Sequence, residues 1–211
     1  MRQQLTKYEI RLEMLKECYQ KIESFKLEID LPEDLLNSLV GSYDNLQNDH
    51  KLTSIIKESF FISRELIDFV ISKLAYEFKG TISNDFTKFM TGLANGNYSE
   101  LNNSCINYLS QPSIIRGLIM IRTIRNKMKK DLDLTFHCKN QKELEITLEV
   151  DIPKKLRDNI TKFDEIMNIK NRDLVTDKSE LKTINYTLFP RNLINDFIVI
   201  FDKMKHECGM K

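Results

Sequence analysis

The chain has 211 residues, of which 41% are hydrophobic and 30% are charged, and its formal net charge is only +1. This composition excludes a disordered chain, and the near-neutral charge excludes a protein whose overall field attracts nucleic acid or membranes. With 6 Gly and 4 Pro, there is little turn chemistry for an all-β fold. No apolar run approaches the roughly 20 residues that span a bilayer, and residues 1–5 do not begin a signal peptide. We therefore expect a mainly α-helical, cytoplasmic protein that does not engage membranes.

The cysteine and histidine residues are scattered along the chain. No Cys-x-x-Cys pair is present, and only two histidines have a cysteine nearby, in the pairs His137–Cys138 and His206–Cys208. Neither pair has a second half at the spacing of zinc ligands. We expect reduced thiols, no metal site and no cofactor.

The first helix is expected over about 2–29, where apolar residues recur at spacings of three and four. This seam consists of Leu5, Tyr8, Leu12, Leu15, Tyr19 and Ile22. Because it lasts only about two and a half heptads, it favours a helix docked on its own bundle over a free coiled coil.

Five further helices are expected over about 32–46, 52–79, 83–95, 99–112 and 113–130. Ser83 and Ser99 are the expected N-caps of the fourth and fifth helices, and Gly80 is the expected C-terminal cap of the third. Between Ile114 and Ile124 the sixth helix is apolar nearly all round, which predicts a central, buried element.

After residue 131 the hydrophobic period changes from helical to alternating. The alternating apolar residues are Leu132, Leu134, Phe136 and Cys138, followed by Leu144, Ile146, Leu148 and Val150. This pattern predicts a small β-hairpin over about 132–150, to which residues 184–188 could add a strand. Helices are expected over about 153–169 and 190–206. We divide the chain into an N-terminal helical extension (1–50), a helical core (51–131) and the hairpin with C-terminal helices (132–211), packed as one compact unit.

The charge distribution singles out the sixth expected helix. Residues 101–130 contain no Asp or Glu, and at about 100° per residue Arg122, Arg125, Asn126 and Lys129 share one face of the helix. Guanidinium groups beside an amide and an ammonium group suit phosphate oxygens. The expected nucleic-acid-binding residues are therefore Arg122, Arg125, Lys127, Lys129 and Lys130.

Two other interpretations of these cations stay open. Cations in the last turn of a helix favour its dipole by about 0.3–1 kcal/mol each, and Arg122 and Arg125 could pair with acids such as Glu65 or Asp68. The basic face could also form a protein interface. Arg64, Glu65 and Asp68 on the third helix are interpreted mainly as a solvated stripe, with polar residues that face the bundle interior as the alternative. The phenylalanines near them, including Phe61, are interpreted as core.

The stretch from Ile124 to Leu132 (IRNKMKKDL), preceded by Gly117-Leu118-Ile119, resembles the Arg-Asn motif of HEPN domains, in particular their mannitol-operon-repressor-like branch. In that family an Arg-Asn pair ends a buried helix, and a His about four to six residues after the Arg serves acid–base chemistry on RNA. The resemblance covers about residues 59–136. It implies a HEPN-like helical bundle, a homodimer whose Arg-Asn helices face each other across a cleft, and Arg125 and Asn126 as the matched catalytic positions.

The histidine of that motif is missing, because Lys130 stands where it would fall. A lysine with a pKa near 10.4 is a poor general base at neutral pH. We therefore expect a catalytically degenerate protein that acts as a regulatory or binding component, with RNA or a partner protein, in a bacterial or phage defence, toxin–antitoxin or transcription-regulation system. An active metal-independent endoribonuclease of HEPN type and a structural helical adaptor are the alternatives.

Overall fold

The computed structural model describes residues 6–24, 50–129, 135–140, 143–153, 181–188 and 190–210. The helices in these ranges are α1 (Lys7–Glu23), α3 (His50–Glu77), α4 (Phe86–Ala94), α5 (Ser104–Leu109), α6 (Pro112–Met128) and α8 (Pro190–Glu207), with a 3-10 turn η2 (Ser99–Leu101). The strands are β1 (Thr135–Asn140), β2 (Glu143–Pro153) and β3 (Leu181–Leu188). The fold is mainly helical, as the sequence predicts. Within these ranges no helix combines the length and apolarity needed to cross a membrane.

Helix α1 begins at a capping box and buries its apolar seam. The Thr6 hydroxyl accepts the Glu9 backbone N–H at 3.3 Å, while the Glu9 carboxylate accepts the Thr6 backbone N–H at 2.8 Å. Together these bonds satisfy two donors that a helix start otherwise leaves unpaired. The buried side consists of Tyr8, Leu12, Leu15, Cys18 and Ile22. The prediction of a helix docked on its own bundle is confirmed for the described part of the seam.

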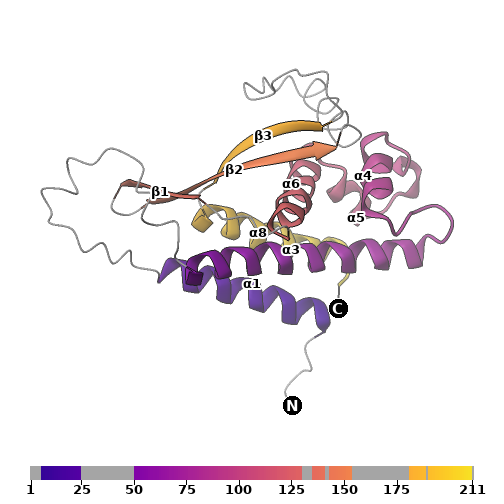
Figure 1. The fold of residues 1–211 in the computed structure, drawn as a ribbon. Helices are drawn as coiled ribbons and strands as arrows, with labels where there is room; N and C mark the ends of the chain where they lie inside the picture. The colour runs from indigo at the N-terminus through magenta and orange to yellow at the C-terminus, as the bar shows by residue number, and fades with distance from the viewer. Residues whose placement is uncertain are drawn as a thin grey trace, which may run out of the picture.

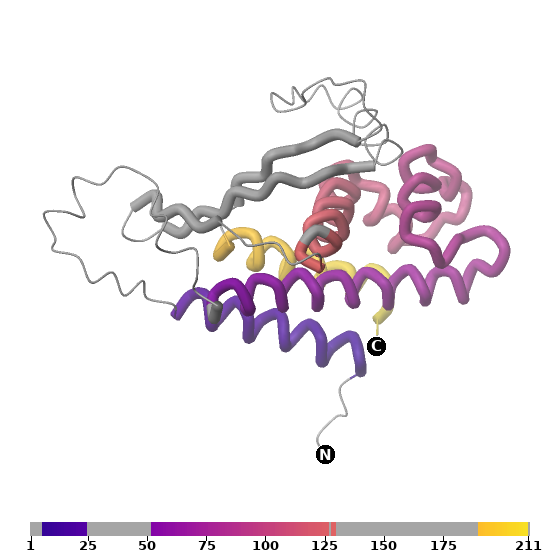
Figure 2. Tube along the Cα trace, viewed as in Figure 1, coloured from indigo at the N-terminus to yellow at the C-terminus, as the bar shows by residue number. Residues whose placement is uncertain are grey.

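The core forms where α1, α3, α6 and α8 meet. Helix α1 lies alongside α3, α8 packs against both, and α6 crosses α3, while α4 and α5 lie near the C-terminal end of α3 (Figures 1 and 2). Phe60 of α3 and Phe197 of α8, both fully buried, meet edge to face with ring centroids 5.3 Å apart. In α6, residues such as Ile115, Ile119 and Ile121 are completely buried. This confirms the prediction that α6 is central.

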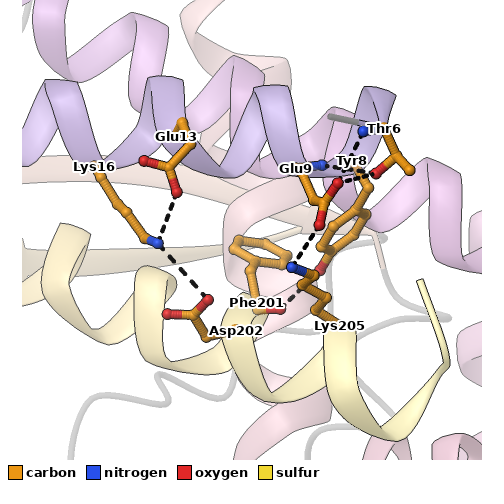
Figure 3. A network of polar contacts seen from close by, with 8 residues as sticks. All are labelled: Thr6, Tyr8, Glu9, Glu13, Lys16, Phe201, Asp202 and Lys205. Carbon is orange, nitrogen blue, oxygen red and sulfur yellow. Dashed lines mark hydrogen bonds and ion pairs between the residues drawn. The ribbon is translucent and has the colours of Figure 1, made fainter. Parts of the chain in front are cut away.

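Hydrogen bonds and ion pairs also join α8 to α1 (Figure 3). The Lys205 ammonium lies 2.7 Å from the Glu9 carboxylate, and the buried Tyr8 hydroxyl donates to the Phe201 carbonyl at 2.9 Å. Lys16 lies between Glu13, at 2.9 Å, and Asp202 of α8, at 3.9 Å. The first and last described helices are therefore joined by both core packing and ion pairs.

The three strands form one antiparallel sheet in the order β1-β2-β3. In the register, Phe136 lies opposite Ile146 and Val150 lies opposite Ile184. Strand β2 contacts α6 and α8, and in Figure 1 β2 and β3 lie on the side of these helices that faces away from α1. The strands lie where the sequence shows alternation over 132–150 and 184–188. The prediction that Leu144, Ile146, Leu148 and Val150 share the buried face concerns side chains that lie outside the described part of the structure.

Two predicted helix starts are wrong in detail. Asp85, not Ser83, caps α4, because its carboxylate accepts the Lys88 backbone N–H at 2.8 Å, while the Ser83 hydroxyl accepts the Asp85 N–H. The helix expected over 99–112 is split, because Asn102 adopts a left-handed conformation (φ 40°) and Asn103 caps α5. Both corrections reflect the competition of Asx side chains for backbone N–H groups. The helices expected over about 32–46 and 153–169 lie outside the described residues.

A disulfide joins Cys105, in the first turn of α5, to Cys208, which follows α8. The expectation of reduced thiols is therefore wrong for this pair. Beside the bond, the Ser104 hydroxyl donates to the Glu207 carbonyl at 2.8 Å. Cys18 is free and buried, and burial raises the pKa of its thiol to about 11, so it stays protonated at neutral pH.

Candidate anion-binding site

Three arginines from two helices meet at one place, which we call the arginine cluster: Arg64 of α3, and Arg122 and Arg125 of α6. All three side chains are half-buried. They meet because α6 crosses α3 and because residues 122 and 125 are three apart, which puts them on one face of the helix.

Two of these arginines share one aromatic ring. The guanidinium carbon of Arg64 lies 4.6 Å from the centroid of the Phe86 ring, and that of Arg122 lies 5.2 Å from it. Phe86 is the first residue of α4 and is only 4% exposed. Each such cation–π contact contributes about 0.5–2 kcal/mol, depending on how far water is excluded. The start of α4 is thus part of the site.

Arg125 stacks on a second ring and contacts its neighbour. Its guanidinium carbon lies 4.9 Å from the centroid of the Phe61 ring, and one terminal N–H donates to the Asn126 side-chain oxygen at 3.3 Å. The ring and the amide limit the guanidinium to a narrow range of orientations. The Arg-Asn pair that the sequence singles out is therefore a contacting pair.

Two carboxylates partly balance the three positive charges. Asp68 pairs with Arg64 at 2.8 Å, one helical turn away on α3, and Asp85 lies at the start of α4. Burial lowers the pKa of Arg64; Asp68 opposes this shift, whereas the charge of Arg122 adds to it. Burial likewise lowers the pKa of Arg122, against the attraction of Asp85 and Asp68. The cluster therefore holds three guanidinium groups that repel one another, and among the described residues only two carboxylates lie near enough to balance them.

Several donors of the cluster have no acceptor in the described part of the chain. The Nη1 group of Arg64 and the Nε group of Arg125 are buried and unbonded. A buried donor without a partner costs about 1–3 kcal/mol, more when it belongs to a charged group. An oxyanion bound at the cluster would supply the missing acceptors.

The structure brings together part of the residue set predicted from the sequence. Arg122, Arg125 and Asn126 lie in the cluster, and Lys129 is exposed just beyond α6. The side chain of Lys127 and the whole of Lys130 lie outside the described residues. Neither Arg122 nor Arg125 has an ion pair with Glu65 or Asp68, because Glu65 pairs with Arg11 and Asp68 pairs with Arg64.

Sequence reasoning missed Arg64 and the two stacking rings. The four-residue spacing of Arg64 and Asp68 was visible as a polar stripe, but nothing in it showed that Arg64 faces α6. Phe61 was expected only in the core, and Phe86 only as an apolar residue of its helix. The absence of acids over 101–130 was the one available signal, and it pointed to α6 alone.

Among the described residues, the groups near the cluster that could exchange protons or bind a metal are the carboxylates of Asp68 and Asp85. Of the three histidines only His206 has a described side chain, and it is exposed near the end of α8. Among the described residues no three His, Cys, Asp or Glu side chains gather in a metal-binding arrangement. The chemistry that the visible site offers is the binding of an anion by hydrogen bonds and charge.

Comparisons with known proteins found no matching family model, curated protein or solved structure for this chain.

Proposed function

We propose that this chain is a HEPN-like helical bundle with a small β-hairpin, which binds RNA through the arginine cluster and acts as a regulatory component without cleaving it. The observation that carries the proposal is the convergence of Arg64, Arg122 and Arg125 on two aromatic rings with buried donors unmet. The context we propose is a bacterial or phage defence, toxin–antitoxin or transcription-regulation system.

Phosphate is the anion that this arrangement fits best. A guanidinium group presents donors in a planar fork that matches two phosphate oxygens. The rings of Phe61 and Phe86 contact all three guanidinium groups, so less side-chain entropy remains to be lost on binding. The exposed Lys129 adds a cation next to the cluster, which favours a chain of phosphates over a single one.

Two features favour binding over cleavage. Lys130 stands at the position of the family's histidine, and the two family-matched positions that remain, Arg125 and Asn126, contact each other. Arginine stabilises charge but does not exchange protons at neutral pH. Without an imidazole, general acid–base catalysis loses a factor of typically about 10²–10⁴ in rate.

The binding test is a titration of a fluorescent 12-nucleotide single-stranded RNA at two salt concentrations. We expect log K to fall with log salt with a slope of about −0.7 for each phosphate contacted. Arg125→Gln should abolish binding while leaving the melting temperature within a few degrees of the original. Arg191→Gln is the matched control, because Arg191 is an exposed arginine of α8 paired with Glu23.

Three outcomes would redirect the proposal. No RNA binding at low salt, with a large melting loss for Arg125→Gln, would make the cluster structural, as in the adaptor alternative. Binding of polyglutamate in place of RNA would indicate an acidic protein partner. Chelator-resistant RNA cleavage that Arg125→Gln abolishes would establish the nuclease alternative, and Lys130→His tests whether the missing histidine restores activity.

The family resemblance also leads us to propose a homodimer. In such a dimer the clusters of two copies would face each other, which doubles the number of phosphates within reach. Sedimentation equilibrium of the full chain tests this directly, and a monomer at micromolar concentration would contradict it.

A further inference from the structure

We infer that Asp68 holds, in the free protein, the place on Arg64 that a ligand phosphate takes, so that Asp68 sets the affinity of the arginine cluster and its preference for dianions. This inference rests on the proposed function. Asp68 positions Arg64 and competes with the ligand for it.

The exposure of the two partners supports this assignment. The Arg64 side chain is only 15% exposed, whereas that of Asp68 is 54% exposed, and the two meet at 2.8 Å through Nη2 of Arg64. The carboxylate therefore lies on the solvent side of the guanidinium group. An anion that arrives from solvent meets Arg64 where Asp68 already binds it.

Asp68 is held weakly enough to be displaced. Water weakens ion pairs between residues four apart on a helix, and in this pair water reaches the Asp68 carboxylate, whereas Arg64 is only 15% exposed. Among the described residues, the Asp68 carboxylate has this ion pair and no hydrogen bond. Burial raises the pKa of Asp68 despite the arginines around it, so its charged form is not strongly favoured there.

Displacement would also satisfy donors that the protein leaves unmet. The Nη1 group of Arg64 has no acceptor among the described residues, and the guanidinium carbon lies 4.6 Å from the centroid of the Phe86 ring. Once Asp68 leaves, the guanidinium can turn on the ring and present both terminal nitrogens to one phosphate. Asp68 cannot supply acceptors to all three arginines, because its side chain is short and its backbone is part of α3.

The competition predicts selectivity for doubly charged oxyanions. With Asp68 and Asp85 ionised, a monoanion gains little by replacing Asp68, since it exchanges one negative charge for another. A phosphate dianion or a run of phosphodiesters brings additional charge to Arg122 and Arg125. Inorganic phosphate at pH 8 should therefore compete with RNA at much lower concentration than acetate.

The decisive variant is Asp68→Asn, which keeps the shape and removes the charge. At an effective dielectric constant near 20, removing the competing negative charge of Asp68 corresponds, after screening, to roughly a tenfold gain in affinity. Glu77→Gln is the matched control, because Glu77 pairs with Lys73 on the same helix with the same spacing. It lies nine residues further on, about 13 Å along the helix axis, beyond the screening length of about 8 Å at physiological salt.

The experiment titrates the 12-nucleotide RNA into wild type, Asp68→Asn, Asp68→Ser, Glu77→Gln and the double variant Arg64→Gln/Asp68→Asn. We expect both Asp68 variants to bind roughly tenfold more tightly, Glu77→Gln to change affinity less than twofold, and the double variant to lose the gain. If wild type binds RNA but neither Asp68 variant binds more tightly, the inference about Asp68 is overturned and the proposed function stands. If neither the wild type nor any variant binds RNA, the inference about Asp68 and the proposed function are both overturned.

Discussion

The Cys105–Cys208 disulfide closes a loop of about half the chain, and Cys208→Ser opens it. The two cysteines are 103 residues apart in sequence. In the chain-entropy model, a cross-link over about 100 residues is worth about 4.7 kcal/mol at 25 °C, because it restricts the unfolded chain. The hydrogen bond from Ser104 to the Glu207 carbonyl does not need the sulfur atoms and should survive the substitution. We expect the free energy of unfolding to fall by about 2–5 kcal/mol.

Urea denaturation with and without dithiothreitol measures this loss. The reductant should lower the stability of the wild type to that of Cys208→Ser and leave Cys208→Ser unchanged, which serves as the internal control. Cys105→Ser/Cys208→Ser should be no less stable than either single variant. The bond itself is checked by alkylating the denatured, unreduced protein, in which Cys105 and Cys208 should escape modification.

Two results would refute the reasoning. Alkylation of Cys105 and Cys208 without reduction would show that the bond does not form in solution. A bond that is present but whose reduction changes stability by less than about 0.5 kcal/mol would show that the unfolded chain is already as restricted as the cross-linked one.

Three further predictions concern single side chains. Gly92→Ala should destabilise the protein by about 1–3 kcal/mol in urea denaturation, because its methyl group would lie 2.7 Å or less from atoms of the buried Tyr98 ring; equal stability would contradict this. Gly117→Ala should instead stabilise α6 by up to about 1 kcal/mol, since its nearest new neighbour is at 3.6 Å. Lys205 and the Thr6 cap lower the pKa of Glu9 from 4.5 to about 2. The stability that Glu9 contributes is therefore complete above about pH 5 and lost as the pH falls toward 2, and Glu9→Gln should lose it at pH 7 with little further change on acidification.

Helices whose burial repeats with the helical period could be predicted from the sequence. The seam from Tyr8 to Ile22 and the apolar stretch from Ile114 to Ile124 locate α1 and α6, because burial of one face or of all faces appears directly in the residue pattern. Helix ends were harder. Ser83 and Asp85 are both good caps, and the choice between them depends on where α4 meets the bundle.

Only part of the arginine cluster could be predicted from the sequence. The lack of acids over 101–130 marked Arg122 and Arg125, since charge asymmetry is a property of the sequence itself. The sequence did not show which acids balance these two arginines. Of the two acids considered, Glu65 pairs with Arg11 of α1, whereas Asp68 pairs with Arg64 and also attracts Arg122.

What the sequence by itself determined is therefore the helical class, the buried α6 and the basic end of that helix. Only the tertiary structure decided that Arg64 joins the cluster, that Arg64 and Arg122 share the Phe86 ring, and that Cys105 meets Cys208. The reason is that the hydrophobic period of a segment shows which of its faces is buried, and this pattern depends only on residues within one or two helical turns. Contacts between residues tens of positions apart depend on how helices cross, and many crossings bury the same apolar faces about equally well.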